Sequence, residues 1–322
     1  MKAIRIHKFG PTEDVLQYED VPVPEPKAGE VLIKVEAASL NRADLGLRKG
    51  TYRISPDALP VIPGREFAGT VAKLGAGVND YRIDQRVVGY PSLGGYAEYA
   101  VAKTSEVRLI PDGVTSTQAA SLPTTSLTAW FGLRTDGNLE LGEWVLIQGG
   151  SSGVGIAAIQ IARAMGCTIF GTAGTPNGLS LIEREGAHLS FDHSKPDYKD
   201  QILKATAGEG VDVILEMLAN VNLGADLKLL AQYGRVIVIG SRGDVSITPR
   251  DLMSRRASVR AFTLWAVTET ETTDIHAAIY AGLDNGTLRP VVGSELPLKD
   301  AAQSHIDVMK PSGAHGKIVL IP

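Results

Sequence analysis

The sequence predicts an α/β protein in which a β-rich domain is combined with a doubly wound parallel sheet. The chain has 322 residues, of which 44% are hydrophobic, so it is long enough for two domains and can fill two cores. Its first 110 residues carry short apolar runs between glycine and proline clusters, a pattern typical of strands. From Thr117 to about residue 264, strand-length apolar runs alternate with stretches of helical period, which predicts βα units.

The β-rich domain is predicted from both ends of the chain. Strands are expected at residues 3–7, 31–37, 68–74, 86–88 and 97–101. The tail shows two helical runs and a final strand, at 274–284, 299–309 and 317–321, which are expected to return to this domain. The predicted domains are therefore 1–122 with 265–322, and 123–264.

The middle of the chain supplies the parallel sheet. Strands are expected at 145–148, 168–172, 189–191, 211–215, 236–240 and 259–264. Helices are expected between most of them, at 154–165, 179–185, 198–207 and 223–232. Six strands with crossovers match a doubly wound sheet.

A glycine- and serine-rich turn, QGGSSGVG, stands between the first of these strands and the first helix. The N–H groups at a helix N-terminus lack internal partners and carry partial positive charge, so a pyrophosphate is stabilised there. The spacing departs from GxGxxG, and a plain tight turn before a helix is the alternative. The strand before the turn, the helix after it and the next strand favour a dinucleotide site.

The net charge and the cysteine content limit the kinds of ligand and metal site that the protein can have. The net charge is −4 and no lysine- or arginine-rich run is present, which disfavours nucleic acid and a basic membrane face and favours small molecules. The N-terminus lacks the apolar stretch of a signal peptide, and no run reaches the roughly 18 apolar residues of a membrane span, so we expect a cytoplasmic protein. Cys167 is the only cysteine, which excludes an intrachain disulfide and a multi-thiolate metal site.

Several segments resemble one enzyme family over nearly the whole chain. They are SLNRADLGLRKGTY, PSLGGYAEY, SLTAW, QGGSSGVG, EMLANVNL and GRVIVIGSRG. These segments are similar to the zinc-independent quinone oxidoreductases of the medium-chain dehydrogenase/reductase superfamily, and most of all to their zeta-crystallin-like branch. The resemblance implies a GroES-like catalytic domain, a Rossmann domain, NADPH as cofactor, reduction of quinones, and a homodimer or homotetramer.

The same resemblance bears on metal. A zinc-dependent relative would place Cys at Asn41, His at Arg65 and typically a Cys near Thr124. Asn and Arg do not supply zinc ligands, and the six histidines show no metal-type spacing. Ala43 occupies the position of the proton-relay hydroxyl of alcohol dehydrogenases. We therefore expect no metal, and reduction of an electrophilic acceptor such as a quinone.

By resemblance, four residues near the nicotinamide are candidates for catalysis. Asn41 could hold a quinone oxygen, Arg48 could offset developing charge, and Tyr52 could donate a hydrogen bond or a proton. The alternatives are that Arg48 is a surface cation and Tyr52 a packing residue. Asp44 matches an acidic position in relatives, but a cap at the start of a helix explains it equally well. Gly46 replaces a tyrosine of many relatives, which suggests a roomier pocket.

The end of the second parallel strand bears on the cofactor. NAD-binding chains usually carry Asp or Glu there, about 20 residues after the glycine turn, whereas this chain has GTAGTPNG without a carboxylate. NADPH is therefore expected, with His193 and Arg242 as candidates for its 2′-phosphate and an exposed loop position as the alternative for His193. Matching motifs add further expected cofactor contacts: Thr128, Ser151, Ser152, Gly153, Val154, Gly174, Asn220, Val238, Ile239, Gly240, Ser241, Phe262, Thr263, Leu264 and Lys317.

Three functions stay open from the sequence. The first is NADPH-dependent quinone reduction. The second is NADPH-dependent reduction of activated C=C bonds in enones or enoyl thioesters, which needs a proton donor such as Tyr52. The third is a zeta-crystallin-like binding or structural role. The acidic composition argues against RNA as the partner in such a role.

Overall fold

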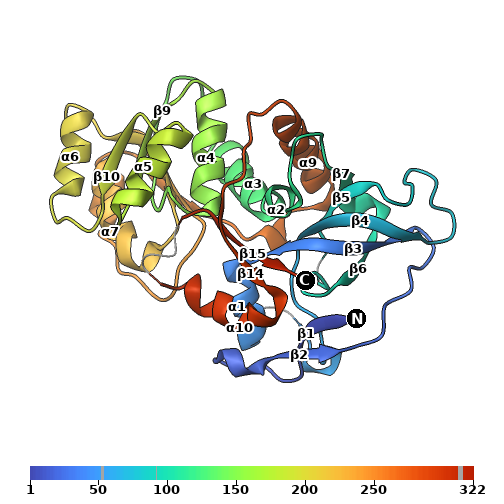
Figure 1. Cartoon of the computed structure of the whole chain (residues 1–322). Coiled ribbons are helices and arrows are strands. Elements are labelled where there is room, and N and C mark those ends of the chain that lie inside the picture. Colours follow the sequence, from blue (N-terminus) through green and yellow to red (C-terminus); the bar gives the residue numbers. More distant parts are fainter. Residues whose placement is uncertain (52–53, 92, 311–314) are drawn as a thin grey trace. The chain divides into compact units, whose positions relative to one another are not determined.

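The computed structural model describes residues 1–51, 54–91, 93–310 and 315–322. The chain divides into two compact units, one of residues 1–124 with 290–322 and one of residues 125–289 (Figure 1). The first boundary lies within two residues of the predicted one. The second boundary follows Arg289 rather than Leu264, so residues 265–289 belong to the parallel-sheet unit and not to the β-rich unit as expected.

The first unit is built on one large, mostly antiparallel sheet. Its strands lie in the order β14, β15, β3, β4, β5, β7, and β6 also pairs with β3. Only β14 and β15 run parallel, and β15 is antiparallel to β3. The bounds are β3 (Glu30–Ser39), β4 (Phe67–Leu74), β5 (Arg86–Gly89), β6 (Tyr99–Lys103), β7 (Val107–Leu109), β14 (Val292–Pro297) and β15 (Lys317–Ile321).

Smaller elements complete this unit. A two-stranded sheet joins β1 (Lys2–Ile6) and β2 (Leu16–Asp20). The helices are α1 (Arg42–Lys49), α2 (Ser116–Ala120) and α10 (Ala301–Asp307), and α3 (Pro123–Trp130) begins at the end of the unit. The short 3₁₀ turns are Glu13–Val15, Pro56–Ala58, Thr104–Glu106 and Leu298–Asp300.

The second unit is a doubly wound parallel sheet. Its strands lie in the order β10, β9, β8, β11, β12, β13, and all neighbours are parallel. Numbered within the unit this is 3-2-1-4-5-6, the order of dinucleotide-binding folds, and the predicted doubly wound parallel sheet is present. The bounds are β8 (Trp144–Ile147), β9 (Thr168–Ala173), β10 (Leu189–Asp192), β11 (Val211–Glu216), β12 (Leu230–Val238) and β13 (Ser258–Ala261).

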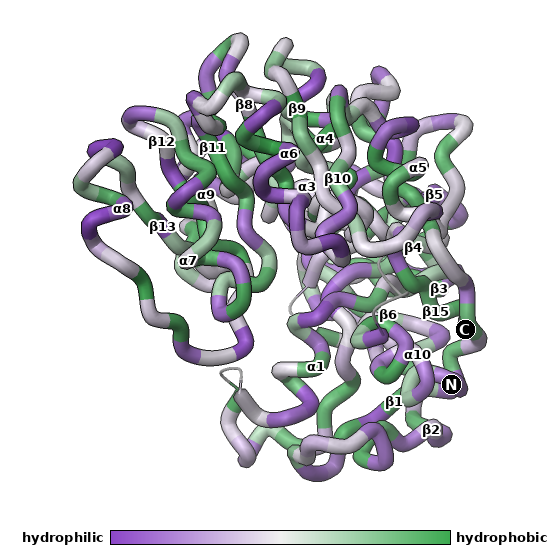
Figure 2. Tube along the Cα trace, turned by 90° about the vertical axis from the view of Figure 1, so that its left-hand side faces the viewer, coloured by the Kyte–Doolittle hydropathy of each residue, from purple (hydrophilic) through white to green (hydrophobic). Residues whose placement is uncertain are grey.

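Helices follow the strands of this sheet. Both α4 and α5 contact β9, and α7 contacts β11 and β12. Figure 2 shows hydrophobic residues along the central strands, in keeping with the full burial of Val145, Ile147, Val213 and Leu215. The bounds are α4 (Gly153–Ala164), α5 (Pro176–Glu185), α6 (Tyr198–Ala205), α7 (Ala219–Leu229), α8 (Pro249–Met253) and α9 (Glu269–Asp284), with a π-helical turn at Phe131–Asp136 and a 3₁₀ turn at Leu264–Ala266.

Predicted and observed elements differ at several of their ends, and some helices were not predicted. The helix expected at 223–232 ends at Leu229, and Leu230 already begins β12, because it pairs with Val211 of the neighbouring strand. The strand expected at 259–264 ends at Ala261. The helix α1 was not among the predicted helices, although Asp44 was considered as a cap at a helix start.

The described part of the chain contains no helix that is both long enough and apolar enough to cross a bilayer.

Candidate active site and cofactor site

A buried ion pair lies at the ends of the interior strands β3, β4 and β15 of the first unit's sheet, close to the start of α1. Glu66 directly precedes β4 and is fully buried, and Lys317 opens β15. The Lys317 ammonium donates to Glu66 Oε1 at 2.8 Å and to Asn41 Oδ1 at 2.7 Å. Asn41 Nδ2 donates to the same Glu66 oxygen at 2.7 Å. The three side chains therefore form one closed, charge-assisted cluster.

Glu66 stays ionised in this cluster. Burial by itself would raise its pKa, but the Lys317 ammonium and the hydrogen bonds to the carboxylate outweigh burial and lower the pKa below its ordinary value. The second carboxylate oxygen accepts the Thr124 N–H at 2.7 Å, and Ser39 donates its hydroxyl to the first. The Glu66 carboxylate thus ties β3, β4, β15 and the start of α3 together.

These contacts decide whether zinc fits here. Zinc needs lone pairs from three or four ligands. The oxygens of Asn41 and Glu66 instead face an ammonium group, which has no lone pair to offer and repels a second cation. The Arg65 guanidinium, at the position of the relatives' histidine, lies 5.2 Å from the centre of the Tyr90 ring. The donor set does not fit zinc, and no grouping of three or more His, Cys, Asp or Glu suited to a metal occurs among the described residues.

Asp44 lies one helical turn from Asn41 and is 1% exposed. Its Oδ2 accepts the Asn41 backbone N–H at 2.8 Å and the Tyr96 hydroxyl at 2.9 Å. Burial raises the pKa of Asp44 to about 6, against the hydrogen bonds that lower it. The geometry provides the helix-start cap that the sequence left as an alternative.

Arg48 is not the surface cation that one reading of the sequence allowed, because its side chain is only 2% exposed. Its guanidinium donates to Glu13 Oε1 and to the Pro11 carbonyl, both at 2.8 Å. The hydrogen bond from Arg48 lowers the pKa of Glu13. Next to this pair, burial and the Arg48 charge lower the pKa of the buried His305 to about 3. Tyr52, the remaining catalytic candidate, lies outside the described residues.

The second unit carries the glycine turn where it was expected. The turn follows β8, and α4 begins at Gly153 with Ser152 as its N-cap, whose Oγ accepts the Gly155 N–H at 3.1 Å. The N–H groups of Gly153 and Val154 have no acceptor within the helix and are available to an anion. A Cβ on Gly155 would lie 2.6 Å from the Gly149 and Gly150 backbone, so only glycine permits this close packing. The residues fit a pyrophosphate.

The end of β9 brings Gly174 and His193 together. A Cβ on Gly174 would lie 2.7 Å from His193 Nε2, so the imidazole lies directly over this glycine. His193 Nδ1 lies 3.3 Å from Thr172 Oγ1. His193 is exposed and lies in the turn after β10, as the exposed-loop alternative describes, and the partial burial of its ring lowers its pKa. Between the end of β9 and the start of α5 lie only Gly174 and the capping residue Thr175, and neither carries a carboxylate.

The start of α7, which follows β11, and the loop after β12 are joined by hydrogen bonds. Asn220 Oδ1 accepts the Arg242 N–H at 2.8 Å, and the Ala219 N–H donates to the Gly240 carbonyl at 2.9 Å. The structure thus brings together the expected group of Asn220 with Val238, Ile239, Gly240, Ser241 and Arg242. The Phe262 ring lies tilted against the Phe131 ring, with the ring centres 4.7 Å apart, and Thr263 and Leu264 follow it in the chain. Thr128 is buried on α3.

Sequence reasoning missed Glu66 and Tyr96. Glu66 in GREFAG directly precedes an apolar strand, but its partner Lys317 lies 251 positions away, so the local sequence does not show that this carboxylate is buried and paired. Lys317 was expected to contact the cofactor, and the structure pairs it with Glu66 and Asn41.

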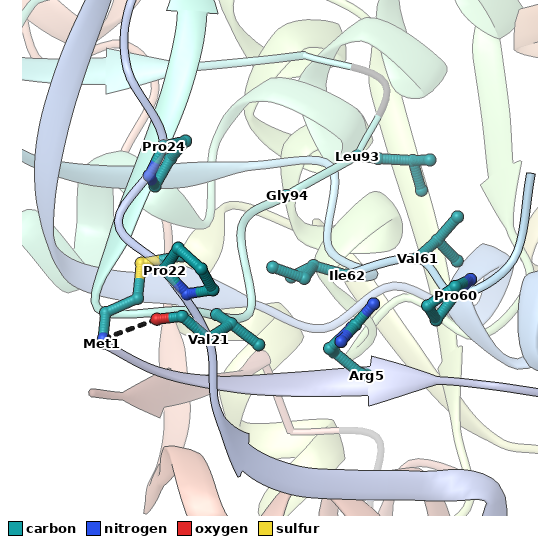
Figure 3. A pocket seen from close by; sticks show the side chains of 10 residues that line it. All are labelled: Met1, Arg5, Val21, Pro22, Pro24, Pro60, Val61, Ile62, Leu93 and Gly94. Atoms are coloured by element: carbon teal, nitrogen blue, oxygen red, sulfur yellow. Dashed lines mark hydrogen bonds between the residues drawn. The ribbon is translucent and has the colours of Figure 1, made fainter.

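The first unit also has an open cavity of about 400 Å³ near the N-terminus (Figure 3). Arg5 reaches into it from β1, between the proline-rich segment after β2 and Pro60 to Ile62. No candidate site residue lines this cavity.

The strand order and the glycine turn of the second unit define a dinucleotide-binding domain. Two family models agree: residues 27–112 match the alcohol dehydrogenase GroES-like domain and residues 153–278 match the zinc-binding dehydrogenase model. The chain is 44% identical to a quinone oxidoreductase of Sus scrofa and 42% identical to one of Homo sapiens, each over 100% of this chain and 98% of the relative. It belongs to the quinone oxidoreductases of the medium-chain dehydrogenase/reductase superfamily, in which the sequence placed it.

Solved structures show the same architecture over the full length. An Escherichia coli quinone oxidoreductase complexed with NADPH aligns with a TM-score of 0.88 at 26% identity, covering 100% of both chains. A structure described as an NAD-dependent alcohol dehydrogenase aligns with a TM-score of 0.92 at 28% identity, also over 100% of both. The predicted combination of a GroES-like domain and a Rossmann domain is confirmed.

Proposed function

We propose that the protein reduces quinones with NADPH and uses no metal ion. The observation that carries this proposal is the similarity to quinone oxidoreductases over the whole chain, at 41–44% identity in several mammals. Bound NADPH supplies one hydride, two electrons with one hydrogen, to a quinone carbon or oxygen. The hydroquinone anion that results takes one proton from solvent or from a side chain, so charge and hydrogen balance.

The glycine turn is proposed to hold the cofactor. Ser151, Ser152, Gly153 and Val154 bind the pyrophosphate at the N-terminus of α4. Gly174 and His193 receive the adenosine 2′-phosphate, with Arg242 as a further donor, because no carboxylate after β9 would repel it. The E. coli enzyme complexed with NADPH supports this choice of cofactor.

The nicotinamide half is proposed to contact the loops after β12 and β13. The residues are Val238, Ile239, Gly240, Ser241, Phe262, Thr263 and Leu264, together with Thr128 on α3, whereas Asn220 is proposed to contact the adenosine or a ribose. These loops follow the carboxyl ends of the parallel strands, where doubly wound folds bind their ligands.

The acceptor is proposed to be held by Asn41. An amide nitrogen has two hydrogens, and the bond to Glu66 uses one, which leaves the other for a quinone oxygen. The Lys317 ammonium polarises Asn41 by donating to its Oδ1, so the remaining N–H is a stronger donor. Asp44 caps α1 and thereby orients Asn41. The roles expected of Arg48 and Tyr52 stay predictions, and Arg48 already has Glu13 and Pro11 as partners.

A rate panel tests the proposal. NADPH and NADH are each assayed against phenanthrenequinone, a naphthoquinone, an enone and an enoyl thioester, with and without a chelator. We expect quinone reduction with NADPH, a preference over NADH of about tenfold or more, and no effect of the chelator. Faster turnover of the enoyl thioester would favour C=C reduction instead, and loss of activity that zinc restores would contradict the metal-free reading.

A homodimer or homotetramer and a cytoplasmic location are proposed from the family resemblance. Light scattering after size-exclusion chromatography measures the first, and fractionation of the source cells measures the second.

A further inference from the structure

Thr172, the fifth residue of β9, lies fully buried between two expected cofactor contacts. Its hydroxyl oxygen accepts the Gly149 N–H at 3.0 Å, and its carbonyl accepts the Gly150 N–H at 2.8 Å. The same hydroxyl donates to Gln148 Oε1 at 2.9 Å and lies 3.3 Å from His193 Nδ1. One threonine therefore contacts both the glycine turn and the histidine.

The hydrogen count at the Thr172 hydroxyl indicates which nitrogen of the His193 ring carries a hydrogen. A hydroxyl has one hydrogen and two lone pairs. The Thr172 hydrogen goes to Gln148 Oε1, and Gln148 is oriented by its own Nε2, which donates to Asp226 Oδ1 at 2.8 Å. One lone pair takes the Gly149 N–H. The second lone pair is left for His193, so Nδ1 carries a hydrogen and donates it.

The other ring nitrogen then faces the expected ligand. With the hydrogen on Nδ1, the neutral ring has its lone pair on Nε2, directly over Gly174. Protonation of Nε2 turns it into a charged N–H donor toward an anion. We propose that Thr172 is a positioning residue that orients His193, so that Nε2 takes up one proton from solvent and binds the 2′-phosphate of the cofactor. This inference rests on the proposed use of NADPH.

The surroundings of the ring suit this uptake. Burial lowers the pKa of His193, so the ring is neutral near pH 7 before the ligand arrives. Asp192, which lies 4.0 Å from Lys195, acts on the ring in the opposite direction. A dianionic phosphate beside Nε2 adds a much closer negative charge and favours the protonated form.

Titration calorimetry with two fragments tests the inference apart from catalysis. Adenosine 2′,5′-bisphosphate and 5′-AMP are titrated into the full chain in two buffers of different ionisation enthalpy. For each ligand, the difference between the binding enthalpies observed in the two buffers gives the number of protons taken up on binding. For the wild type we expect about tenfold tighter binding of the bisphosphate, with uptake of up to one proton that 5′-AMP does not show.

Three variants separate positioning from folding. Thr172→Val removes the hydroxyl at constant shape and should lose at least fivefold of the preference together with the proton uptake, whereas Thr172→Ser should keep both. Thr206→Val is the matched control, because the buried Thr206 hydroxyl likewise joins two backbone groups, Leu203 and Gly210. It should lower stability and leave the preference unchanged. A Thr172→Val protein that keeps preference and uptake overturns the inference.

A measurement on the unaltered protein covers the case in which Thr172→Val does not fold. The ¹⁵N shifts of His193, assigned with His193→Gln, should show the Nδ1–H form at neutral pH. The Nε2–H form overturns the inference. Quinone reduction with NADPH is assayed in the same preparation, so that its absence refutes the proposed function and its presence confines a negative result to Thr172.

Discussion

Asp44 carries a buried carboxyl group whose ionisation opposes folding. Its pKa is raised by burial to about 6, from 3.8 in an exposed aspartate. Between these values the folded chain binds more protons than the unfolded chain. The stabilisation is therefore fully present below about pH 4 and is lost as the pH rises through about 6.

The comparison of wild type with Asp44→Asn isolates this effect. Asparagine does not ionise, and its Oδ1 can accept the same N–H and hydroxyl groups. From about pH 4.5 to about pH 7.5 the wild type should lose about 2 kcal/mol of unfolding free energy relative to the variant. Urea unfolding at both pH values measures it. The buried His305 has the opposite effect, because its lowered pKa makes the folded protein less stable as the pH falls below 6.5. Both proteins contain His305, so its effect cancels in the comparison. A pH-independent difference would contradict the raised pKa.

Single residues near one another in sequence were the easier part to foresee. The cap formed by Asp44 was one of two readings of an acidic residue three positions after Asn41. The ion pair of Glu66 and Lys317 joins residues 251 positions apart, and no local pattern indicates such a pair. The burial of Arg48 likewise depends on Glu13, which lies in a separate segment. A charged residue is expected to be exposed when only the sequence is known, because the distant residue that pairs with it on burial cannot be identified.

At the scale of elements, the packing of α4 against the glycine turn depends on Gly155. A Cβ there would meet backbone atoms of the turn at 2.6 Å, and backbone cannot move aside cheaply. Gly155→Ala should therefore displace the turn, costing several kcal/mol of stability by overpacking and most of the affinity for NADPH. Thermal unfolding and fluorescence titration measure the two effects.

Gly224→Ala is the matched control for this prediction. Gly224 lies within α7, where a Cβ would have only the Ser246 carbonyl near it, at 3.6 Å. Alanine is favoured over glycine in a helix by up to about 1 kcal/mol, so this variant should be neutral or more stable. Equal losses in both variants would mean that any added methyl group is harmful and that the turn contact is not special.

Elements with a strong period were predicted well, and their ends were not. The glycine turn, β8, β9 and α4 follow from strand-length apolar runs, the glycine- and serine-rich turn and the helical spacing after it. The end of α7 was missed because the run Leu229–Leu230 is apolar and buried in either conformation, and pairing with β11 makes the second leucine a strand residue. Tertiary pairing overrides such local ambiguity.

For the whole molecule, the position of the second boundary is the main departure from the sequence prediction. Counting six parallel strands places the end of the second domain at Leu264, but α9 follows within the same unit. Its Ile275, Ile279 and Leu283 are at most 6% exposed. The loop that follows α9 is held by Gln160 of α4, which donates to the Arg289 carbonyl at 3.0 Å and accepts the Arg289 N–H at 2.9 Å. A strand count does not reveal a terminal helix of this kind.

Two fragments test this boundary. A fragment of residues 125–289 keeps α9 and both bonds between Gln160 and Arg289, whereas a fragment of residues 125–264 loses them and leaves apolar surface exposed. Each large side chain that is no longer buried costs about 1.5–3 kcal/mol, so the loss of several approaches the stability of a typical domain. We expect the longer fragment to unfold cooperatively in urea and to bind adenosine 2′,5′-bisphosphate, and the shorter one to do neither. A shorter fragment of equal stability and affinity would return the boundary to Leu264, because α9 would then contribute nothing to the nucleotide-binding unit.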